Sequence, residues 1–323
     1  MAMTYPKVSV IIPVKNEALK IRACIDGILQ QTVRVNEIIV IDSGSTDDTL
    51  AILKTYPQIK LIEIPESSFN HGDTRNLGVQ VANGEFLLFT VGDARPYDDQ
   101  WIEELLKGFL DKDVAAVCGQ QVVPHEKDKN PYEWFLPISE PKILRFQYDN
   151  PKTFESLSSV EKKNVCSWDD VNAMYRSSVL HLIPFQRTSY SEDAIWAKDA
   201  ILSGCAIVYQ QNAKVYHYHQ ENSDFTFKRT FTTLYFRYRL FGFVPSKPKL
   251  TIKKRLSLIK HLSKRIGTIS VQEVLFWYKY NLSIIKSSIK AHNYFFACIN
   301  EGTDEQLDNL HETICGKPPI PVK

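Results

Sequence analysis

Two short apolar runs decide the fold: KVSVIIP at residues 7–13 and EIIVID at residues 37–42. Both runs are continuous rather than alternating, which is typical of strands that are buried on both faces of a parallel sheet. Residues 16–31 lie between them and carry apolar side chains at helical spacing, with Lys15 or Asn16 expected at the helix entry. This stretch therefore predicts a strand, a helix and a second parallel strand.

The alternation of strands and helices continues along the chain. The pattern predicts helices at 49–55 and 73–82 and strands at 61–64 and 85–90. Such repeated alternation favours an α/β fold with a mostly parallel, doubly wound, Rossmann-like sheet. Because ligands bind such sheets at the carboxyl ends of the strands, we expect the site residues directly after each strand.

The middle of the chain is less regular, and between 125 and 164 the pattern weakens. The regular pattern returns at 171–175. The other predicted elements are helices at 101–110 and 192–203, a strand at 114–123 in an edge or mixed position, and strands at 206–209 and 214–217. Everything after about residue 221 is typical of helices rich in aromatic and basic residues.

The composition is that of a globular protein with a sizeable core, since 44% of the 323 residues are hydrophobic and 24% are charged. The first residues resemble no secretory signal, and no run of about 18 apolar residues predicts a membrane-spanning helix. The six cysteines are scattered without a CxxC pair. They indicate reduced thiols of an intracellular protein and no structural zinc site.

The net charge of +2 hides a strong asymmetry. Residues 225–290 contain fifteen Lys or Arg and one acid, Glu273, so this segment carries +14 and the rest of the chain −12. Basic helices with interleaved aromatic residues suit an anionic membrane surface, and they equally suit a packing surface in a homo-oligomer. The acidic remainder and the lack of a nucleic-acid motif argue against binding to nucleic acid.

The loop DSGSTDDT at residues 42–49 follows a predicted strand. Asp42 is placed to accept hydrogen bonds from a ribose or a base, and Ser45 and Thr46 are candidates to cap the next helix. The alternative is an ordinary helix-entry loop with solvated acids.

The segment FNHGDTRNLG at residues 69–78 puts Arg75 in the first turn of a helix, where the helix dipole disfavours a cation. An arginine there makes sense if it faces a diphosphate or a carboxylate. Gly78 allows the helix to approach a strand or a ligand closely. The alternative is a packed helix with a solvated arginine.

The segment FLLFTVGDAR at residues 86–95 is an apolar strand that ends at Gly92 and Asp93. A hard cation such as Mg²⁺ or Mn²⁺ needs few protein oxygens when a diphosphate supplies the others, so Asp93 is a candidate ligand. An aspartate that only forms a turn is the alternative.

Two further segments carry titratable groups. Glu192 and Asp193 open a helix, where the dipole favours acids, and one of them could serve as a general base or merely cap the helix. His217 and His219 share one face of a strand and could bind a metal or a phosphate, although an ordinary polar edge is the more common meaning of such a pair.

Taken in order, these segments resemble glycosyltransferase family 2, the inverting transferases with a GT-A fold. The resemblance spans about residues 7–220 and rests on VIIPVKNE at 10–17, the loop at 42–49, RNLG at 75–78, GDA at 92–94, NAMYR at 172–176 and the acids at 192–193. One departure is Val91, which stands where the first aspartate of the family's DxD motif would be.

The resemblance implies that different segments of the chain have different functions. Residues 1–120 would bind the nucleotide sugar, 121–222 would bind the acceptor and hold the base, and 223–323 would form a basic, aromatic helical extension. The implied donor-binding residues are Pro13, Glu17, Asp42, Ser45, Arg75, Asn76, Gly92 and Asp93. The implied metal ligands are Asp93, His217 and His219, for Mg²⁺ or Mn²⁺. Asp193 matches the catalytic base, with Glu192 in support, and Trp168, Asn172 and Trp196 are expected on the acceptor side.

The segments at 69–76 and 92–94 resemble the rhamnosyltransferase branch of the family, whose donor is dTDP-L-rhamnose. The implied function is transfer of a sugar to a glycan or lipid-linked acceptor in cell-surface polysaccharide synthesis. The implied place is the cytoplasm, peripherally on the inner face of the plasma membrane.

Three alternatives stay open. A UDP-hexose or UDP-HexNAc could be the donor, or the protein could be a non-catalytic module that binds nucleotide sugars or glycans. A nucleotidyltransferase would normally have a Gly-rich loop after the first strand, which residues 14–17 do not supply. The central expectation is that Asp93 and Asp193 converge on one cleft.

Overall fold

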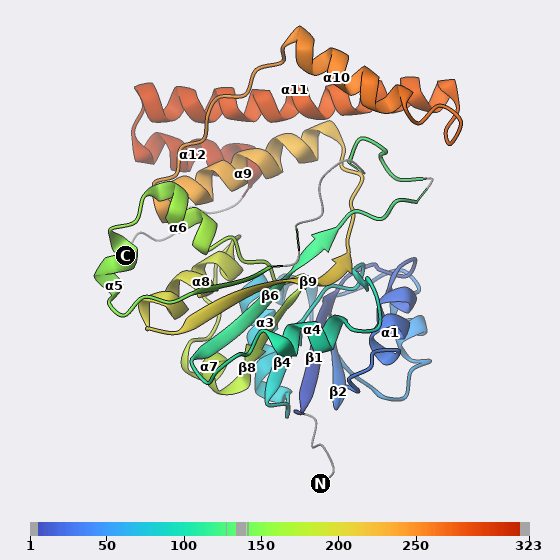
Figure 1. Ribbon diagram of the computed structural model, residues 1–323, viewed down its shortest axis with the longest axis vertical. Coiled ribbons are helices and arrows are strands. Elements are labelled where there is room, and N and C mark those ends of the chain that lie inside the picture. Colours follow the sequence, from blue (N-terminus) through green and yellow to red (C-terminus); the bar gives the residue numbers. More distant parts are fainter. Residues whose placement is uncertain (1–5, 127, 134–139, 141, 317–323) are drawn as a thin grey trace. The chain divides into compact units, whose positions relative to one another are not determined.

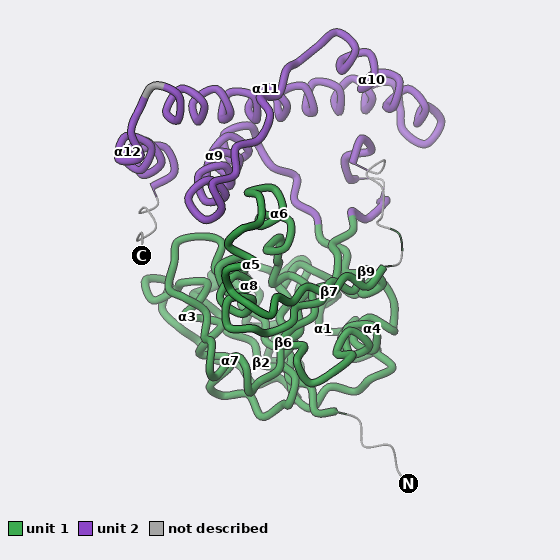
Figure 2. Tube along the Cα trace, turned by 60° about the vertical axis from the view of Figure 1, so that its left-hand side comes forward, with its two compact units in different colours: residues 1–122, 139–217 green, residues 123–138, 218–323 purple. Residues whose placement is uncertain are grey.

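The computed structural model describes residues 6–126, 128–133, 140 and 142–316. The chain forms two compact units, residues 1–122 with 139–217 and residues 123–138 with 218–323 (Figure 2). Both of the regions assigned by sequence to donor and acceptor, 1–120 and 121–222, contribute strands to the single sheet of the first unit.

The sheet of the first unit has the strand order β3-β2-β1-β4-β8-β6-β9-β5, and β7 also pairs with β9. Its strands are β1 (Val8–Val14), β2 (Glu37–Asp42), β3 (Ile59–Glu63), β4 (Phe86–Phe89), β5 (Arg95–Pro96), β6 (Val114–Val122), β7 (Ile143–Phe146), β8 (Ala173–Arg176) and β9 (Ala206–Tyr216). The predicted strands at 7–13, 37–42 and 85–90 are thereby confirmed as β1, β2 and β4.

Helices connect these strands (Figure 1). They are α1 (Ile21–Leu29), α2 (Thr49–Leu53), α3 (His71–Val81), α4 (Trp101–Lys107), α5 (Pro151–Glu155), α6 (Ser159–Val165), α7 (Ser177–Leu182) and α8 (Glu192–Leu202). The first helix begins at Ile21 with Lys20 as its N-cap, so the expected entry at Lys15 or Asn16 is wrong.

Alternate residues of β1 face opposite layers, as a doubly wound sheet requires. Val10 and Ile12 belong to one core cluster with Ile25 of α1 and Trp101 of α4. Ile11 points to the other side, where a Cβ at Gly78 of α3 would lie only 2.5 Å from its Cγ2 atom. The predicted role of Gly78 in a close helix–strand approach is confirmed.

Strand direction explains where polar residues gather. The strands β1, β2, β3 and β4 are parallel, β8 is antiparallel to both β4 and β6, and β6 is parallel to β9. One edge of the sheet therefore collects the carboxyl ends of β1, β2, β4, β6 and β9 together with the amino end of β8.

The two predictions for this part of the sheet have different outcomes. The strand predicted at 114–123 in an edge or mixed position is mixed, as expected, and lies in the interior of the sheet between β8 and β9. The prediction of two separate strands at 206–209 and 214–217 is wrong, because both belong to one strand, β9, whose pairing with β6 shifts register between Cys118 and Gln120.

The second unit is helical, as expected. It contains α9 (Ser223–Phe241), α10 (Ile252–Ser263), α11 (Val271–Glu301) and α12 (Asp304–Cys315), and α11 packs against each of the other three. Among the helices of the described residues, none combines the length and the apolar character that a membrane span requires.

Candidate active site

The edge where the strands end brings together most of the predicted donor-binding residues. Glu17 follows β1, Asp42 ends β2, Asp93 follows β4 and His217 follows β9. All four strands point to the same edge, so residues from distant parts of the sequence become neighbours in the folded protein.

Asp42 is buried at the end of β2 and uses only one of its two carboxylate oxygens. Its Oδ1 atom accepts hydrogen bonds from the backbone N–H groups of Gly44 and Ser45, each at 2.9 Å. Its Oδ2 atom is buried and has no hydrogen-bond partner among the described residues. A buried acceptor without a donor is costly, so this oxygen suits an N–H or O–H group of a ligand.

The loop after β1 and the loop after β2 are held together by hydrogen bonds. Asn16 has a left-handed backbone, with φ of 56°. Its N–H donates to Ser45 Oγ at 2.8 Å, and its Oδ1 accepts from Thr46 N–H at 2.8 Å. The N-cap of α2 is Asp48, and it makes no side-chain capping bond. The expectation that Ser45 and Thr46 cap this helix is therefore wrong, because both are used on the neighbouring loop.

Asp93, His217 and His219 form the candidate metal group. Their ligand-capable atoms all lie within 4.8 Å of one another. The closest printed approach is between Asp93 Oδ1 and His217 Nε2, at 3.5 Å. One carboxylate and two imidazoles are a donor set that suits Mn²⁺ as well as other divalent transition metals.

The tautomer of His217 follows from its other contact. Gln121 Nε2 donates to the carboxylate of Asp169, so the Oε1 atom of the same amide faces His217 Nδ1, at 2.5 Å. Because Oε1 only accepts, this contact fits the tautomer of His217 that carries its proton on Nδ1. In that tautomer the lone pair lies on Nε2, which faces Asp93, and two acceptors that face each other in this way fit a cation between them.

Two more charged groups border Asp93. Lys20 Nζ lies 3.2 Å from Asp93 Oδ2. Burial, and then the negative charge of Asp93, raise the pKa of Glu17 from 4.5 to about 7. A Cβ at Gly92 would lie 2.9 Å from Cγ1 of Val14 and 3.1 Å from Cγ of Glu17, so a larger residue there would push against both side chains. Glu17, assigned by resemblance to the nucleoside, thus lies beside the candidate metal group.

Asp193 lies in the first turn of α8, where other carboxylates surround it. Its Oδ1 accepts a hydrogen bond from the N–H of Ala194 at 2.7 Å. Burial raises the pKa of Asp193 well above its ordinary value, and the negative charges of Glu192 and Asp170 raise it further. A carboxylate with a raised pKa takes a proton more readily from a hydroxyl group.

Arg75 is buried and lies between two carboxylates. Its Nε atom is 2.9 Å from Asp170 Oδ2, and its Nη1 atom is 2.7 Å from Glu192 Oε1. Nη1 also donates to the backbone oxygen of His71. Of the two partners expected from the sequence, a diphosphate or a carboxylate, the structure places carboxylates beside Arg75.

The metal side and the base side of the site are joined by a chain of side chains. His217 contacts both Asp93 and Gln121, and Gln121 donates to Asp169. Asp169 in turn is close enough to Asp193 to raise its pKa. This chain is consistent with the expectation that Asp93 and Asp193 belong to one site.

The residues expected on the acceptor side support the site from within the protein. Trp196 is buried and donates to the backbone oxygen of Ile183, and Trp168 is buried and donates to Tyr175. The buried amide of Asn172 accepts from the indole N–H of Trp101 and donates to two backbone oxygens.

Asn76 is engaged in the same manner, since its amide makes two hydrogen bonds with the backbone of Phe185. The polar groups of Trp168, Asn172, Trp196 and Asn76 are therefore all hydrogen-bonded within the protein. Their burial and hydrogen bonds give no sign that they contact a ligand directly.

Sequence reasoning missed four residues of the site: Lys20, Gln121, Asp169 and Asp170. The signal for the acidic pair was present, because Asp169 and Asp170 lie just before β8, separated from it by Val171 and Asn172, much as Glu192 and Asp193 open α8. Its meaning depended on β8 running opposite to its neighbours, which brings the amino end of β8 to the site.

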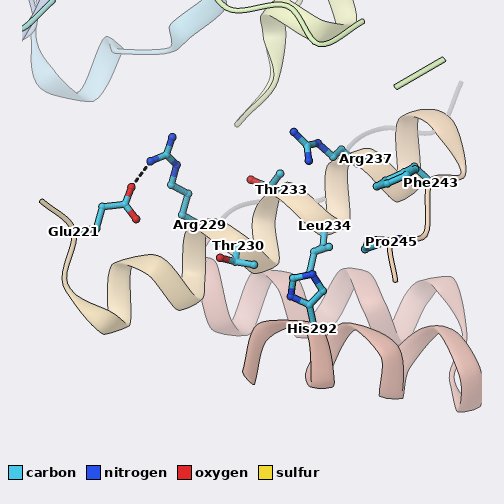
Figure 3. Close-up of a pocket in the computed structure, with 9 residues that line it drawn as sticks. All are labelled: Glu221, Arg229, Thr230, Thr233, Leu234, Arg237, Phe243, Pro245 and His292. Carbon is cyan, nitrogen blue, oxygen red and sulfur yellow. Dashed lines mark hydrogen bonds and ion pairs between the residues drawn. The ribbon is translucent and has the colours of Figure 1, made fainter. Parts of the chain in front are cut away.

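The second unit contains a pocket of about 340 Å³ on α9 (Figure 3). Arg229, Thr233 and Arg237 point to the same side of the helix, and Glu221 is ion-paired with Arg229. The other lining residues are Thr230, Leu234, Phe243, Pro245 and His292. Guanidinium and hydroxyl groups beside apolar side chains suit an anionic ligand with an apolar part.

Comparison with known proteins places this geometry in context. Residues 9–182 match the sequence profile described as Glycosyl transferase family 2. The O-antigen chain rhamnosyltransferase RfbN of Salmonella typhimurium is 34% identical over 232 residues, which cover 70% of this chain and 71% of that protein. The O-antigen chain rhamnosyltransferase WbaN of Salmonella anatum is 35% identical over 209 residues, which cover 63% of each.

Two solved structures share the fold. The mannosyltransferase PcManGT from Pyrobaculum calidifontis, in complex with GDP-Man and Mn²⁺, aligns with a TM-score of 0.52 and 18% identity, over 96% of this chain and 80% of that one. TarS of S. aureus in complex with UDP aligns with a TM-score of 0.51 and 18% identity, over 90% of this chain and 91% of that one.

Proposed function

The chain belongs to glycosyl transferase family 2 and is a glycosyltransferase with a GT-A fold, and we propose that it transfers L-rhamnose from dTDP-L-rhamnose to an acceptor with inversion. The acceptor is a glycan or a lipid-linked glycan of a cell-surface polysaccharide. The donor assignment is supported by the two O-antigen rhamnosyltransferases that are 34% and 35% identical to this chain.

One observation carries the catalytic part of the proposal. Asp193, a carboxylate with a strongly raised pKa, interacts electrostatically with Asp169, and contacts through Gln121 connect Asp169 to the candidate metal ligands His217 and Asp93. A base for the acceptor and a cation site for the leaving diphosphate are the two groups that inverting sugar transfer requires. A module that only binds nucleotide sugars has no need for the first.

We assign the roles residue by residue. Asp42 Oδ2 accepts a hydrogen bond from the nucleoside, because it is a buried oxygen at the end of β2 that has no hydrogen-bond partner among the described residues. Asp93, His217 and His219 hold a divalent cation, Mg²⁺ or Mn²⁺, which when bound neutralises the charge of the diphosphate. Arg75 keeps Glu192 and Asp170 in place beside the base.

Asp193 then removes the proton of an acceptor hydroxyl. The hydroxyl oxygen forms a bond to the anomeric carbon of the donor sugar from the face opposite the diphosphate. The bond between that carbon and the diphosphate oxygen breaks, and the electron pair leaves with the nucleoside diphosphate. The configuration at the anomeric carbon inverts.

The test is release of nucleoside diphosphate from a panel of sugar nucleotides, with Mn²⁺ and a crude lipid-linked glycan acceptor. The expected result is turnover of dTDP-L-rhamnose well above that of UDP-glucose or UDP-GlcNAc. Preferential turnover of a UDP sugar would replace the rhamnose assignment by the alternative donor. Tight binding of a sugar nucleotide without turnover would identify a binding module instead.

The proposal includes the cellular location of the protein. A lipid-linked acceptor lies at a membrane, and we propose peripheral attachment at the inner face of the plasma membrane. The strongly basic segment 225–290 supports this assignment. A packing role of the same segment in a homo-oligomer is the alternative.

A further inference from the structure

Helix α10 is apolar on two faces. On one face, Leu258 and Leu262 are buried and form a core cluster with residues of α11 and the preceding turn. On another face, Ile252, Leu256 and Ile259 are 77%, 60% and 45% exposed. Their spacing of four and three residues aligns them along the helix, so they form a continuous apolar stripe on the surface of the unit.

Further apolar side chains are exposed in the segment that follows α10. Ile266 lies in the turn that follows, and Val271, Leu275 and Phe276 lie in the first turns of α11; all four side chains are more than half exposed. We call these four residues and the stripe of Ile252, Leu256 and Ile259 the α10 surface. Exposed apolar side chains clustered in this way mark an interaction surface more often than isolated ones do.

The charge around the α10 surface has a single sign. Residues 247–265 contain eight Lys or Arg and no Asp or Glu. Lys253, Lys254, Arg255 and Lys260 belong to α10 itself and are all exposed. Self-association through this surface would bring like charges together, and nucleic acid offers no counterpart for the exposed isoleucines and leucine. Anionic lipid headgroups above an acyl layer match both features.

We propose that the α10 surface docks on an anionic phospholipid bilayer, with α10 lying in the plane of the interface. The apolar stripe enters the boundary between headgroups and acyl chains, and the flanking lysines and arginine contact the headgroup phosphates. The inference rests on the proposed function only in that a lipid-linked acceptor makes membrane attachment useful.

The docked orientation has a consequence within the second unit. Helix α11 lies between α10 and α9 in both views (Figures 1 and 2). The docked helix therefore does not itself cover the pocket on α9, because α11 separates α10 from α9.

The test is co-sedimentation of the full chain with vesicles of phosphatidylcholine, either pure or mixed with phosphatidylglycerol. The wild-type chain should bind the anionic vesicles at least roughly tenfold more than the pure phosphatidylcholine ones. Replacing Ile252, Leu256 and Ile259 together by Ser should reduce that binding by roughly tenfold or more. Lys253→Gln with Lys254→Gln should have a similar effect that is stronger at low salt.

The matched control replaces three exposed apolar residues of the first unit, Leu110, Val160 and Leu182, by Ser. These replacements should leave vesicle binding unchanged. Circular dichroism of each variant confirms that it is folded. Absence of wild-type binding to anionic vesicles, or equal loss in the control, would overturn the proposal. Concentration-dependent dimerisation that the Ile252, Leu256 and Ile259 triple variant abolishes would assign the surface to a second copy of the chain instead.

Release of nucleoside diphosphate separates this inference from the proposed function. Vesicle binding without any turnover would leave the α10 surface intact as a membrane surface and remove the enzymatic assignment. Turnover without vesicle binding would support the enzymatic assignment and exclude the α10 surface as a membrane surface.

Discussion

The Nε2 atom of His217 lies 3.5 Å from the Oδ1 atom of Asp93, although the two residues follow different strands, β9 and β4. Asp93 stands alone where the family motif would have two aspartates, because Val91 occupies the first position. The imidazole beside it supplies the second donor. The departure in the motif is therefore compensated, in our proposal, by a residue from the far side of the sheet.

The orientation of His217 should depend on Gln121. Replacing Gln121 by Leu removes the acceptor for the Nδ1 proton and should raise the Mn²⁺ concentration for half-maximal activity by roughly 10- to 100-fold. Direct titration of Mn²⁺ into the chain should show the same shift. Gln120→Leu is the control, since Gln120 is the neighbour of Gln121 in β6 and its side chain donates to the backbone oxygen of Gln211. An unchanged Mn²⁺ requirement in Gln121→Leu would exclude the proposed positioning role.

Arg75 should be needed mainly for stability. Arg75→Ala leaves Asp170 and Glu192 buried without their cation, which should lower the free energy of unfolding by roughly 3–5 kcal/mol. The measurement is urea unfolding. The matched control is Arg187→Ala, which removes an exposed ion pair with Asp73 and should cost at most about 1 kcal/mol. A stable Arg75→Ala chain that no longer binds the nucleotide would instead favour contact with the diphosphate.

The pH dependence of turnover should report on Asp193. Transfer needs the deprotonated carboxylate, so the rate falls as the pH drops through the raised pKa of Asp193. Asp169→Asn removes one of the negative charges that raise this pKa. The acid limb of the pH profile, measured as kcat with saturating donor, should therefore move to lower pH. A shift to higher pH would mean that Asp193 is not the group that titrates.

Asp42 should contribute to nucleotide affinity through its unpartnered oxygen. Asp42→Asn can keep the two hydrogen bonds from Gly44 and Ser45, but it replaces the second oxygen by an N–H donor. Binding of dTDP, measured by titration calorimetry, should weaken by about 1–3 kcal/mol. The exposed Asp48 of the same loop is the control, and Asp48→Asn should bind dTDP as the wild type does.

The strands were predictable from sequence where both faces of the sheet are covered. The continuous apolar runs of β1 and β2 left no other assignment for residues 7–13 and 37–42. Where a strand leads into the site, polar residues interrupt the pattern. Gln120 and Gln121 in β6 therefore suggested an edge strand, and β7, α5 and α6 were not predicted at all.

Several residues of the candidate site could be named from the sequence, but their pairings could not. Asp42, Asp93 and Asp193 stood out because each is polar and directly follows a strand or opens a helix. The partners of Arg75 depend on β8 running antiparallel to β4, and no local pattern in the sequence gives that direction. Gln121 was not predicted, because its positioning role depends on its contacts with His217 and Asp169, which only the folded structure shows.

The measurement that tests the central claim most directly compares Asp193→Asn with the wild type, for sugar transfer and for nucleotide binding. A general base contributes roughly 10²–10⁴-fold, so transfer from dTDP-L-rhamnose should fall by at least about 100-fold. The affinity for dTDP should stay within about twofold, because Asp42 and the candidate cation ligands are untouched. Retained transfer, or a loss of binding as large as the loss of transfer, would contradict the assignment of Asp193 as the base.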